Sequence, residues 1–444
     1  LPVRLFRDMI AAVCEKKQGR DGLSSFQTLV ISTATRVGMG NLVGVVAAVS
    51  AGGAGAVFWM WVTAILGAST SFIESTLAQK YRQPDPLYGG WRGGPAYYLH
   101  VLAERRRGKK LKRSVVAALF AVSGLICWCG ISQVISNSVS SAFQNAFHIP
   151  PLTTTLVLTA LAALIVLRKN ATVKSLDVIV PVMAVCYFVM TLYVIATNIT
   201  HLPAVLGSIF SEAFGLRQVA AGGFGAVLMN GIKRGLYSNE AGIGSAPNAA
   251  ASADVSHPAK QGLVQMLSVF IDTILICSST AFMILCTNLD ASAYVDAAGN
   301  TMNAAYIQDS LVANFGSAGS VFITVALTLF AFTTLVGNYF YAEMNISYLY
   351  PKATKNKPFM LFYRLLAAVI IFMGAQFSAG LAWDLADVLM GIMALINVPS
   401  CLIMGKTACK ALVDYRKQKS EGKNPVFHAA DIGLSGTDYW IETE

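Results

Sequence analysis

The chain of 444 residues contains ten long apolar stretches, about the length that a helix needs to cross a lipid bilayer. About 20 apolar residues span the hydrocarbon core as a helix, and only helices and closed barrels satisfy the backbone in lipid. Because the stretches are far too long for barrel strands, the sequence predicts an all-α membrane protein. We place the spans at residues 24–50, 54–79, 115–143, 152–167, 176–198, 218–238, 260–287, 318–349, 358–377 and 383–408.

The composition excludes several other classes of protein. Hydrophobic residues make up 55% of the chain and charged residues only 13%, with a mean hydropathy of +0.57, whereas soluble domains carry roughly 25% charged residues. A disordered chain and a water-soluble enzyme are therefore excluded. The eight cysteines form no CxxC motif and no zinc-type Cys/His spacing. The spans carry no His pair and no nucleophile–base set, so we expect no enzyme activity.

The net charge of +10 is concentrated in alternate loops. The segments 1–23, 80–113 and 406–423 are rich in Lys and Arg, whereas the loops 144–151 and 288–317 contain neither. Since positive loops stay on the cytoplasmic side, we expect a multi-pass protein of the cell (plasma or inner) membrane with both chain ends in the cytoplasm. The charge is then a signal of topology, and we expect no nucleic-acid partner. The chain begins without Met, and we expect an upstream helix to be missing.

The ten spans divide into two halves of five. The first half covers residues 24–198 and the second covers 218–409, with an extracellular linker at 199–217 between them. A cytoplasmic amphipathic segment at 1–23 precedes the halves, and a cytoplasmic tail at 410–444 follows them. Because each half has an odd number of spans, the second half is inverted in the membrane. This pattern of inverted repeats is typical of secondary transporters.

Glycines interrupt the first span of each half. Broken helices at matching positions of inverted repeats mark the midplane site of a transporter, because the N-terminus of a half-helix attracts a carboxylate and its last carbonyls attract a cation. Close helix packing through small residues is the alternative explanation for such glycines. The interruptions contain Gly38, Gly40 and Asn41 in the first span, and Gly222, Gly223, Gly225, Asn230 and Gly231 in the sixth.

Several motifs together resemble the alanine or glycine:cation symporter family of sodium-coupled amino-acid carriers. The most specific is GLYSNEAGIGSAP at 235–247, and the likeness continues in ATRVGMGNLVGV at 34–45, HPAKQGLVQMLSVFIDT at 257–273 and AFTTLVGNYFYAE at 331–343. The resemblance extends over essentially the whole chain. It implies a LeuT-type fold of five-plus-five inverted repeats with spans one and six broken, usually preceded by one extra helix, which would lie upstream of Leu1.

The resemblance also implies a sodium site and a substrate site. The Na⁺ ligands correspond to the carbonyls of Ala34 and Val37 with the hydroxyls of Thr333 and Thr334, unless these hydroxyls only bond back to their own helix. The substrate carboxylate is expected at the N–H groups from Gly38 to Asn41. The other residues of the expected substrate site are Met39 and Gly40 beside this break, Gln133 on the third span, and Phe224, Met229 and Asn230 at the sixth span, where Phe224 or Met229 bounds the side-chain pocket.

Ionisable residues in the middle of a membrane span are costly and usually functional. Asp272 lies in the seventh span and is a candidate second cation ligand or proton carrier, with a hydrogen-bonded structural carboxylate as the alternative. Glu74 and Arg36 are a possible bracing pair. Glu240 is a candidate gating residue. Glu343 lies near a span end, where contact with water is enough to account for a charged side chain.

The chain also departs from the family pattern inside the expected pocket. The first break usually reads GTGN in the family, and Met39 here replaces a hydroxyl. In the third span the family often has Gln two residues before an Asn-Ser pair, but here Ile135 stands there and the glutamine is displaced to Gln133. These changes leave the coupling residues in place and leave the identity of the amino acid open.

The residues and the resemblance together predict a symporter that imports a small neutral amino acid, such as alanine or glycine, with Na⁺ by alternating access. The lipid bilayer is its environment, and no obligate protein partner is evident. Proton coupling through Asp272 is the first alternative, and a channel or a sensor on a transporter scaffold is the second.

Overall fold

The computed structural model describes residues 4–15, 23–85, 90–167, 171–215, 223–287, 289–294, 302–353, 356–374, 379–433 and 440. Helices dominate this part of the chain, and a short antiparallel hairpin pairs β1 (Gln83–Pro84) with β2 (Trp91–Arg92). Seven of the described helices are long and apolar enough to cross a membrane, and the bent pair α2–α3 makes an eighth. This confirms the prediction of an all-α membrane protein.

A helix coincides with every predicted span. Eight of the ten predicted spans correspond to the seven long helices and the bent pair. The other two, 152–167 and 218–238, coincide with the shorter helices α7 and α11, which have 17 residues each. The span helices are α2 (Ser25–Arg36), η1 (Gly40–Gly44) and α3 (Val45–Gly52) for the first span, then α4 (Gly55–Lys80), α6 (Val115–Phe147), α7 (Pro151–Leu167), α8 (Ala171–Thr197), α11 (Gly223–Asn239), then α13 (Pro258–Val269), η2 (Phe270–Cys277) and α14 (Ser278–Leu285) for the seventh span, and α16 (Ser317–Leu349), α17 (Lys357–Gly374) and α18 (Ala379–Ser420).

Shorter elements lie outside the spans. The loops expected between the spans contain α5 (Pro95–Arg107), α9 (Leu202–Ala213) and α15 (Asn303–Phe315), and α12 (Pro247–Ala251) follows the sixth span. The last helix, α18, continues beyond the predicted span into the charged tail and has 42 residues. Hydropathy marks the part of a helix that lies in lipid, whereas residues such as Lys, Ala and Arg continue the same helix in water.

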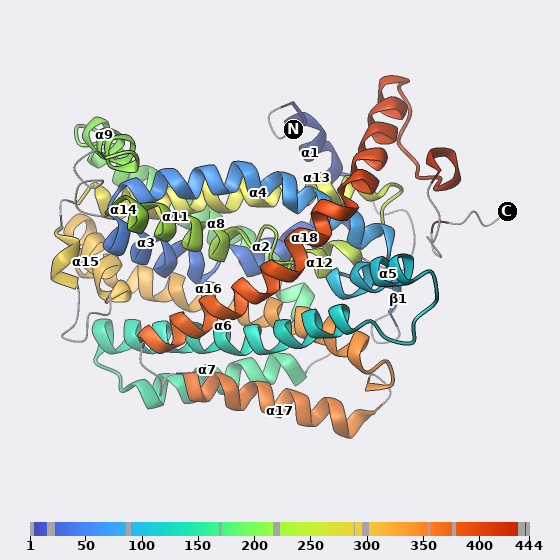
Figure 1. Cartoon of the computed structure of the whole chain (residues 1–444). Coiled ribbons are helices and arrows are strands. Elements are labelled where there is room, and N and C mark those ends of the chain that lie inside the picture. The colour runs from blue at the N-terminus through green and yellow to red at the C-terminus, as the bar shows by residue number, and fades with distance from the viewer. Residues whose placement is uncertain are drawn as a thin grey trace.

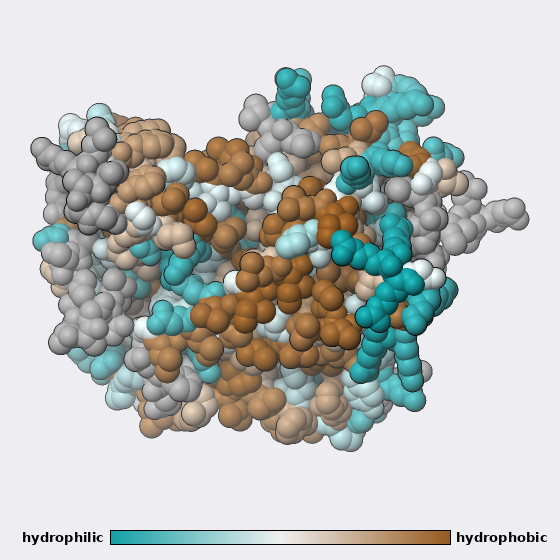
Figure 2. All heavy atoms as spheres, viewed as in Figure 1, coloured by the Kyte–Doolittle hydropathy of each residue, from teal (hydrophilic) through white to brown (hydrophobic). Residues whose placement is uncertain are grey.

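The long helices run side by side along one direction of the molecule (Figure 1). Both chain ends, α1 (Phe6–Val13), α5 and the hairpin lie at one end of this bundle, and α9 and α15 lie at the other. Hydrophobic side chains form a broad band over the middle of the visible face, and hydrophilic side chains gather at the end that carries the termini (Figure 2). An apolar band of this kind is the surface that faces the hydrocarbon core of a bilayer.

At the end with the termini, segments from both ends of the chain are fastened to the start of α13. The buried Lys260 Nζ donates to Glu15 Oε1 at 2.6 Å and to Asn424 Oδ1 at 2.8 Å. His257 Nδ1 accepts from the amide of Ala259, so Nε2 carries the proton that faces Asp414 Oδ2 at 3.2 Å. Burial lowers the pKa of His257, although Asp414 opposes this shift, and so favours the neutral imidazole.

The first span breaks where the sequence predicts. Helix α2 ends at Arg36 and the π-helix η1 begins at Gly40, with a bend of 49° between α2 and the η1–α3 segment. The amide of Gly38 donates to Asn41 Oδ1 at 2.9 Å, so a side chain replaces one of the lost helical acceptors. The three residues between the helices leave backbone N–H and C=O groups without intrahelical partners.

The break in the sixth span lies further along the chain than the sequence analysis placed it. Helix α11 runs without interruption through 223–239, so the prediction of a break between Phe224 and Asn230 was wrong, and Gly222 lies outside the described residues. The chain instead leaves helical geometry after Asn239, and Glu240, Gly242 and Gly244 all have positive φ, at 54°, 86° and 92°. Glycine inside a helix costs only about 1 kcal/mol, whereas a run of positive φ values cannot continue a right-handed helix.

Candidate functional site

The first break meets the seventh span through Asn41 and Asp272. Asn41 Nδ2 donates to Asp272 Oδ1 at 2.7 Å and to the backbone carbonyl of Asp272 at 3.1 Å. Both side chains are fully buried. The second carboxylate oxygen of Asp272 accepts from Ser238 Oγ and from Thr273 Oγ1, each at 2.8 Å. Asp272 therefore joins the first span, the end of α11 and its own π-helix in one polar cluster.

The expected sodium ligands are only partly brought together. Thr334 Oγ1 lies 3.3 Å from the carbonyl oxygen of Ala34, and it also bonds the carbonyl of Phe330 one turn earlier in α16 at 2.8 Å. A Cβ added to Gly38 would lie 2.0 Å from this hydroxyl, so only glycine leaves room for it. Thr333 Oγ1 bonds back to the carbonyl of Phe330 on its own helix, at 3.0 Å. The hydroxyl of Thr334 and the carbonyl of Ala34 are hard oxygen ligands of the kind that Na⁺ and other hard cations take.

The second break is held by Glu74 of α4 and Asn397 of α18. Glu74 Oε1 accepts from the amide of Gly242 at 3.2 Å, and Glu74 Oε2 accepts from Asn397 Nδ2 at 2.8 Å. Asn397 Nδ2 also donates to the carbonyl of Gly242 at 2.9 Å. This carboxylate does not form an ion pair with Arg36 among the described residues. Arg36 instead donates to the side chain of Gln265 at 3.1 Å and to Ser71 at 3.2 Å.

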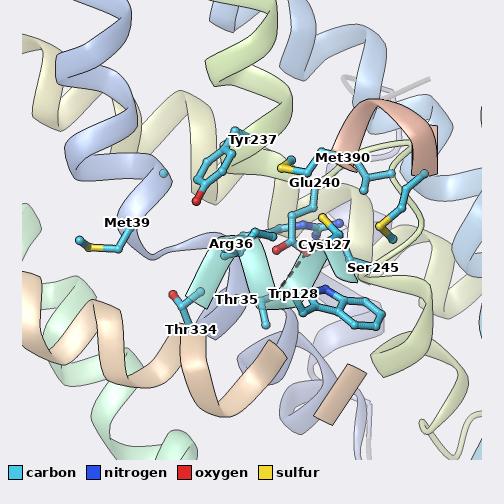
Figure 3. Close-up of a pocket in the computed structure, with 14 residues that line it drawn as sticks. Thr35, Arg36, Met39, Cys127, Trp128, Tyr237, Glu240, Ser245, Thr334 and Met390 are labelled. Carbon is cyan, nitrogen blue, oxygen red and sulfur yellow. Dashed lines mark hydrogen bonds between the residues drawn. The ribbon is translucent and has the colours of Figure 1, made fainter. Parts of the chain in front are cut away.

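A small cavity lies between the two breaks and is closed by α6, α16 and α18. Its volume of about 20 Å³ has room for a water molecule rather than an amino acid, so the walls must move when a substrate binds. Tyr237 and Trp128 lie on opposite sides, with Arg36 and Glu240 between them (Figure 3). The lining consists of Thr35, Arg36, Met39, Gly40, Cys127, Trp128, Ile131, Tyr237, Glu240, Ile243, Ser245, Thr334, Met390 and Met393.

Polar groups in this cavity are few and come from both breaks. Glu240 Oε2 accepts from Ser245 Oγ at 2.6 Å and from Thr35 Oγ1 at 3.5 Å. The hydroxyl of Tyr237 points toward the middle of the group in Figure 3, and it is buried without a hydrogen-bond partner. Met39 also lines the cavity, although its side chain is directed away from the other labelled residues. A buried hydroxyl without a partner is a group that a polar ligand can satisfy.

Six expected substrate residues do not line this cavity: Gly38 and Asn41 lie at the first break beside it, and Gln133, Phe224, Met229 and Asn230 lie elsewhere. Gln133 lies on the part of α6 that faces α17, because a Cβ on Gly374 would meet its backbone at 2.6 Å. Phe224, Met229 and Asn230 lie on the uninterrupted part of α11, and the Met229 side chain is 50% exposed. The reason is the position of the second break, which brings residues after Tyr237, rather than those before it, to the cavity.

Sequence reasoning overlooked several residues of the cavity wall. Cys127 and Trp128 stand inside the apolar stretch of the third span, and nothing near them in the sequence marks them as neighbours of a break on another span. The sequence analysis proposed Glu240 only as a gating residue, whereas the structure places it in the cavity wall. Glu343 was also misjudged, because it is buried and accepts from Tyr339 Oη at 2.5 Å rather than lying in solvent.

The arrangement of helices is that of known membrane carriers. The structure of MhsT in complex with L-phenylalanine superposes with a TM-score of 0.58 at 13% identity and covers 85% of this chain and 89% of that one. A manganese transporter from Eremococcus coleocola gives 0.54 and covers 93% and 84%. The described helices and these likenesses show that the chain has the LeuT-type fold.

The sequence comparisons narrow the class to one family. The chain belongs to the sodium:alanine symporter family, whose model matches residues 1–429. The amino-acid carrier protein AlsT of Bacillus subtilis is 43% identical over 98% of this chain and 90% of its own length. The sodium/alanine symporter AgcS of Methanococcus maripaludis is 36% identical over 90% and 86%. The sodium/proton-dependent alanine carrier protein of Bacillus sp. is 36% identical over 97% of both chains.

Proposed function

We propose that this protein imports a small neutral amino acid together with Na⁺. The observation that carries the proposal is the meeting of Thr334 Oγ1 with the Ala34 carbonyl at the first break, beside a cavity that both breaks line. A cation held there is shared between α2 and α16, so its binding favours the state in which these helices are close. The names of the relatives AgcS and AlsT agree with an amino acid as the carried solute.

The substrate is proposed to lie across the gap between the breaks. Its carboxylate meets the free N–H groups at the start of η1, around Met39 and Gly40, where the helix dipole favours an anion. Its ammonium group meets the carboxylate of Glu240, and the hydroxyl of Tyr237 supplies a further hydrogen bond. Gly38 and Asn41 belong to the same proposed site, because they shape the break.

The side chain of the substrate is proposed to be small and uncharged. Cys127, Trp128, Met390 and Met393 form the wall opposite the breaks, and none of these side chains carries a charge at neutral pH. Methionine side chains adapt their shape readily, so the wall accepts modest differences in size. The relative named as a probable sodium/glutamine symporter, GlnT, is 43% identical, and glutamine therefore belongs in any competition panel.

Uptake into proteoliposomes tests the proposal. With an inward Na⁺ gradient, labelled alanine should accumulate, and Thr334→Ala should raise the Na⁺ concentration for half-maximal uptake about tenfold or more. Thr333→Ala is the matched control, because the Thr333 hydroxyl donates to the Phe330 carbonyl of its own helix, whereas that of Thr334 reaches Ala34. Uptake that follows a proton gradient and ignores Na⁺ would overturn sodium coupling.

Proton coupling is the second candidate, and Asp272 is the observation that favours it. A fully buried carboxylate between the two breaks is well placed to exchange a proton during the transport cycle. In that case Asp272→Asn should abolish the pH dependence of uptake while substrate binding remains. Because one relative is named a sodium/proton-dependent alanine carrier protein, uptake should be measured with a Na⁺ gradient and with a proton gradient.

The orientation in the membrane is also a proposal. The termini and the basic end of α5, at Arg105, Arg106 and Arg107, lie at the same end of the bundle, and positive charge is retained in the cytoplasm. We place this end inside the cell and α9 and α15 outside. Single cysteines at Arg107 and at Ser208 should react with an impermeant maleimide from inside and outside, respectively, and the reverse pattern would invert the topology.

A further inference from the structure

A groove lies between the end of α5, the start of α6 and the middle of α18, at the end of the bundle that carries the termini. Its volume is about 410 Å³, which is in the range of sites that hold organic ligands. Most of its wall is apolar, and part of this wall is open to the outside of the bundle, since Val115 is 67% exposed and Leu395 is 77% exposed.

Three arginines complete the lining of this groove. Arg106 and Arg107 belong to the last turn of α5, and Arg113 precedes Ser114, the N-cap of α6. Within the described residues, the exposed side chains of Arg106 and Arg107 form no ion pair and no hydrogen bond. Arg113 Nη2 donates to the carbonyl of Leu349, and a guanidinium group has further N–H donors. The groove therefore combines an apolar wall with guanidinium groups that can bind an anion.

The groove crosses the boundary between hydrocarbon and water. On α18, the lining residue Leu395 precedes the exposed Lys406 by about 16 Å along the helix, and Ile403 precedes it by about one turn. On α6, the exposed Val115 follows Arg113 almost directly. Figure 2 shows hydrophilic side chains beside the hydrophobic band at this end of the bundle. Since basic residues flank the apolar part of a membrane span at the headgroup level, the arginines lie at that level and the apolar wall extends into the hydrocarbon.

The charge around the groove is strongly positive. Residues 104–113 contain seven Lys and Arg and one acidic residue, Glu104, which already accepts from the amide of Leu111 at 2.8 Å. Basic clusters next to membrane helices attract anionic lipids, and the planar guanidinium group binds two phosphate oxygens at once. A soluble anion would use the arginines but leave the apolar wall uncovered, whereas a phospholipid with a net negative charge matches both parts.

We propose that this groove binds an anionic phospholipid of the leaflet on the side of the termini. The phosphate accepts from the guanidinium groups of Arg106, Arg107 and Arg113, and one acyl chain lies along α18 past Leu395. The zwitterionic phospholipids have the same acyl chains but no net negative charge, so the basic cluster discriminates against them.

The helices around the groove are also connected to the second break. Tyr98 Oη of α5 donates to Asn397 Oδ1 of α18, and Asn397 Nδ2 donates to the carbonyl of Gly242 at 2.9 Å. A lipid between α5 and α18 thus holds together the two helices whose contact supports this break. Because a ligand that binds only the folded state stabilises it, the lipid should raise the unfolding temperature of the carrier.

Lipid retention measured by native mass spectrometry tests the proposal. The carrier in detergent receives equal amounts of phosphatidylglycerol and phosphatidylcholine with the same acyl chains. The wild type should retain phosphatidylglycerol about tenfold better, and the double variant Arg106→Gln/Arg107→Gln should lose most of this preference. Lys109→Gln/Lys110→Gln is the matched control, because it removes the same charge from exposed residues that do not line the groove. Equal losses in both double variants, or no preference in the wild type, would overturn the site.

A second pair of variants tests the apolar wall. Ala103→Phe keeps every charge and fills space in the groove, so it should lower retention of phosphatidylglycerol about fivefold. Val122→Phe on α6 is its control, because Val122 is 43% exposed and does not line the groove. Retention in Ala103→Phe equal to that of the wild type would overturn the acyl-chain contact.

Two further measurements separate the alternatives. Glycerol phosphate carries the charge without acyl chains and should not displace the lipid; displacement at equal concentration would overturn the phospholipid assignment. Phosphatidylglycerol should raise the unfolding temperature of the wild type and of Lys109→Gln/Lys110→Gln, but not that of Arg106→Gln/Arg107→Gln. All variants should elute as monodisperse carriers. If Ala103→Phe fails this check, the two glutamine pairs still decide the question, because their side chains are exposed.

Discussion

The two breaks that line the central cavity differ in how the backbone groups that leave helical geometry are held in place. The first break, between Arg36 and Gly40, is short, and polar side chains from neighbouring helices replace the missing backbone partners: Asn41 turns back on the Gly38 amide and reaches Asp272. The second, after Asn239, is longer, and its backbone passes through three positive φ values. Side chains of α4 and α18, namely Glu74 and Asn397, fasten it from outside.

This difference shows what each break depends on. The first relies on side-chain hydrogen bonds and on close approach of α16, so it is sensitive to polar substitutions and to the size of Gly38. The second relies on glycine conformations that other residues rarely adopt, so it is sensitive to any side chain at Gly244. Four substitutions test this distinction, and they are given from the largest expected effect to the smallest.

Gly244→Val should have the largest effect. The residue has a φ of 92°, and a Cβ there would lie 2.7 Å from Pro95 and 2.8 Å from Phe120. Backbone strain of about 1–3 kcal/mol adds to a packing overlap of about 1–3 kcal/mol. We expect loss of folded carrier after detergent extraction, measured by size-exclusion chromatography. Gly108→Val is the control, because it has a positive φ but nothing within 4 Å, and similar losses in both would attribute the effect to φ alone.

Gly38→Ala should disrupt the first break and leave the fold intact. The new methyl group would lie 2.0 Å from Thr334 Oγ1, so the hydroxyl must rotate away from the Ala34 carbonyl. We expect the Na⁺ concentration for half-maximal uptake to rise about tenfold, at an unchanged amount of folded carrier. Gly44→Ala in the same π-helix is the control, since its nearest neighbour would lie at 3.8 Å. An unchanged Na⁺ dependence would contradict the proposed ion site.

Asp272→Asn should have an intermediate effect on stability. The amide group of the new side chain cannot accept from Asn41, Ser238 and Thr273 all at once, and each buried group left unsatisfied costs about 1–3 kcal/mol. We expect a lower unfolding temperature in a thermal shift assay, whereas Asp384→Asn on the exposed side of α18 should leave it unchanged. A variant of normal stability that has lost only its ion dependence would instead indicate a coupling role.

Gly225→Ala should have the smallest effect and the opposite sign. This residue lies in the part of α11 where the sequence predicted a break, and a Cβ there meets nothing within 4 Å. Alanine in place of a helical glycine stabilises by about 0.4–1 kcal/mol. We expect an equal or slightly higher unfolding temperature and normal uptake. Loss of uptake would indicate that α11 opens at this position during transport.

Most of the architecture could be predicted from the sequence, because lipid demands long uninterrupted apolar helices and excludes charged loops. The first break was predictable as well, since Gly38 and Gly40 interrupt an otherwise apolar span. The second was misplaced because Gly223 and Gly225 stand in an apolar stretch, as Gly38 does, whereas Gly242 and Gly244 stand beyond its polar end. Glu74 and Asn397, from distant parts of the chain, hold the backbone of Gly242 at this break.

The sequence by itself therefore determined the class of protein, the position of the spans and the first break, since these follow from local hydropathy and from residues that do not favour helix. Only the tertiary structure decided which polar groups meet. Asn41 and Asp272 are 231 positions apart, and Thr334 and Ala34 are 300 apart. Such contacts depend on the register of packed helices, where a shift of one residue turns a side chain by about 100° around the axis. The pairing of the cation ligands and the wall formed by Cys127 and Trp128 were for that reason not visible before the fold.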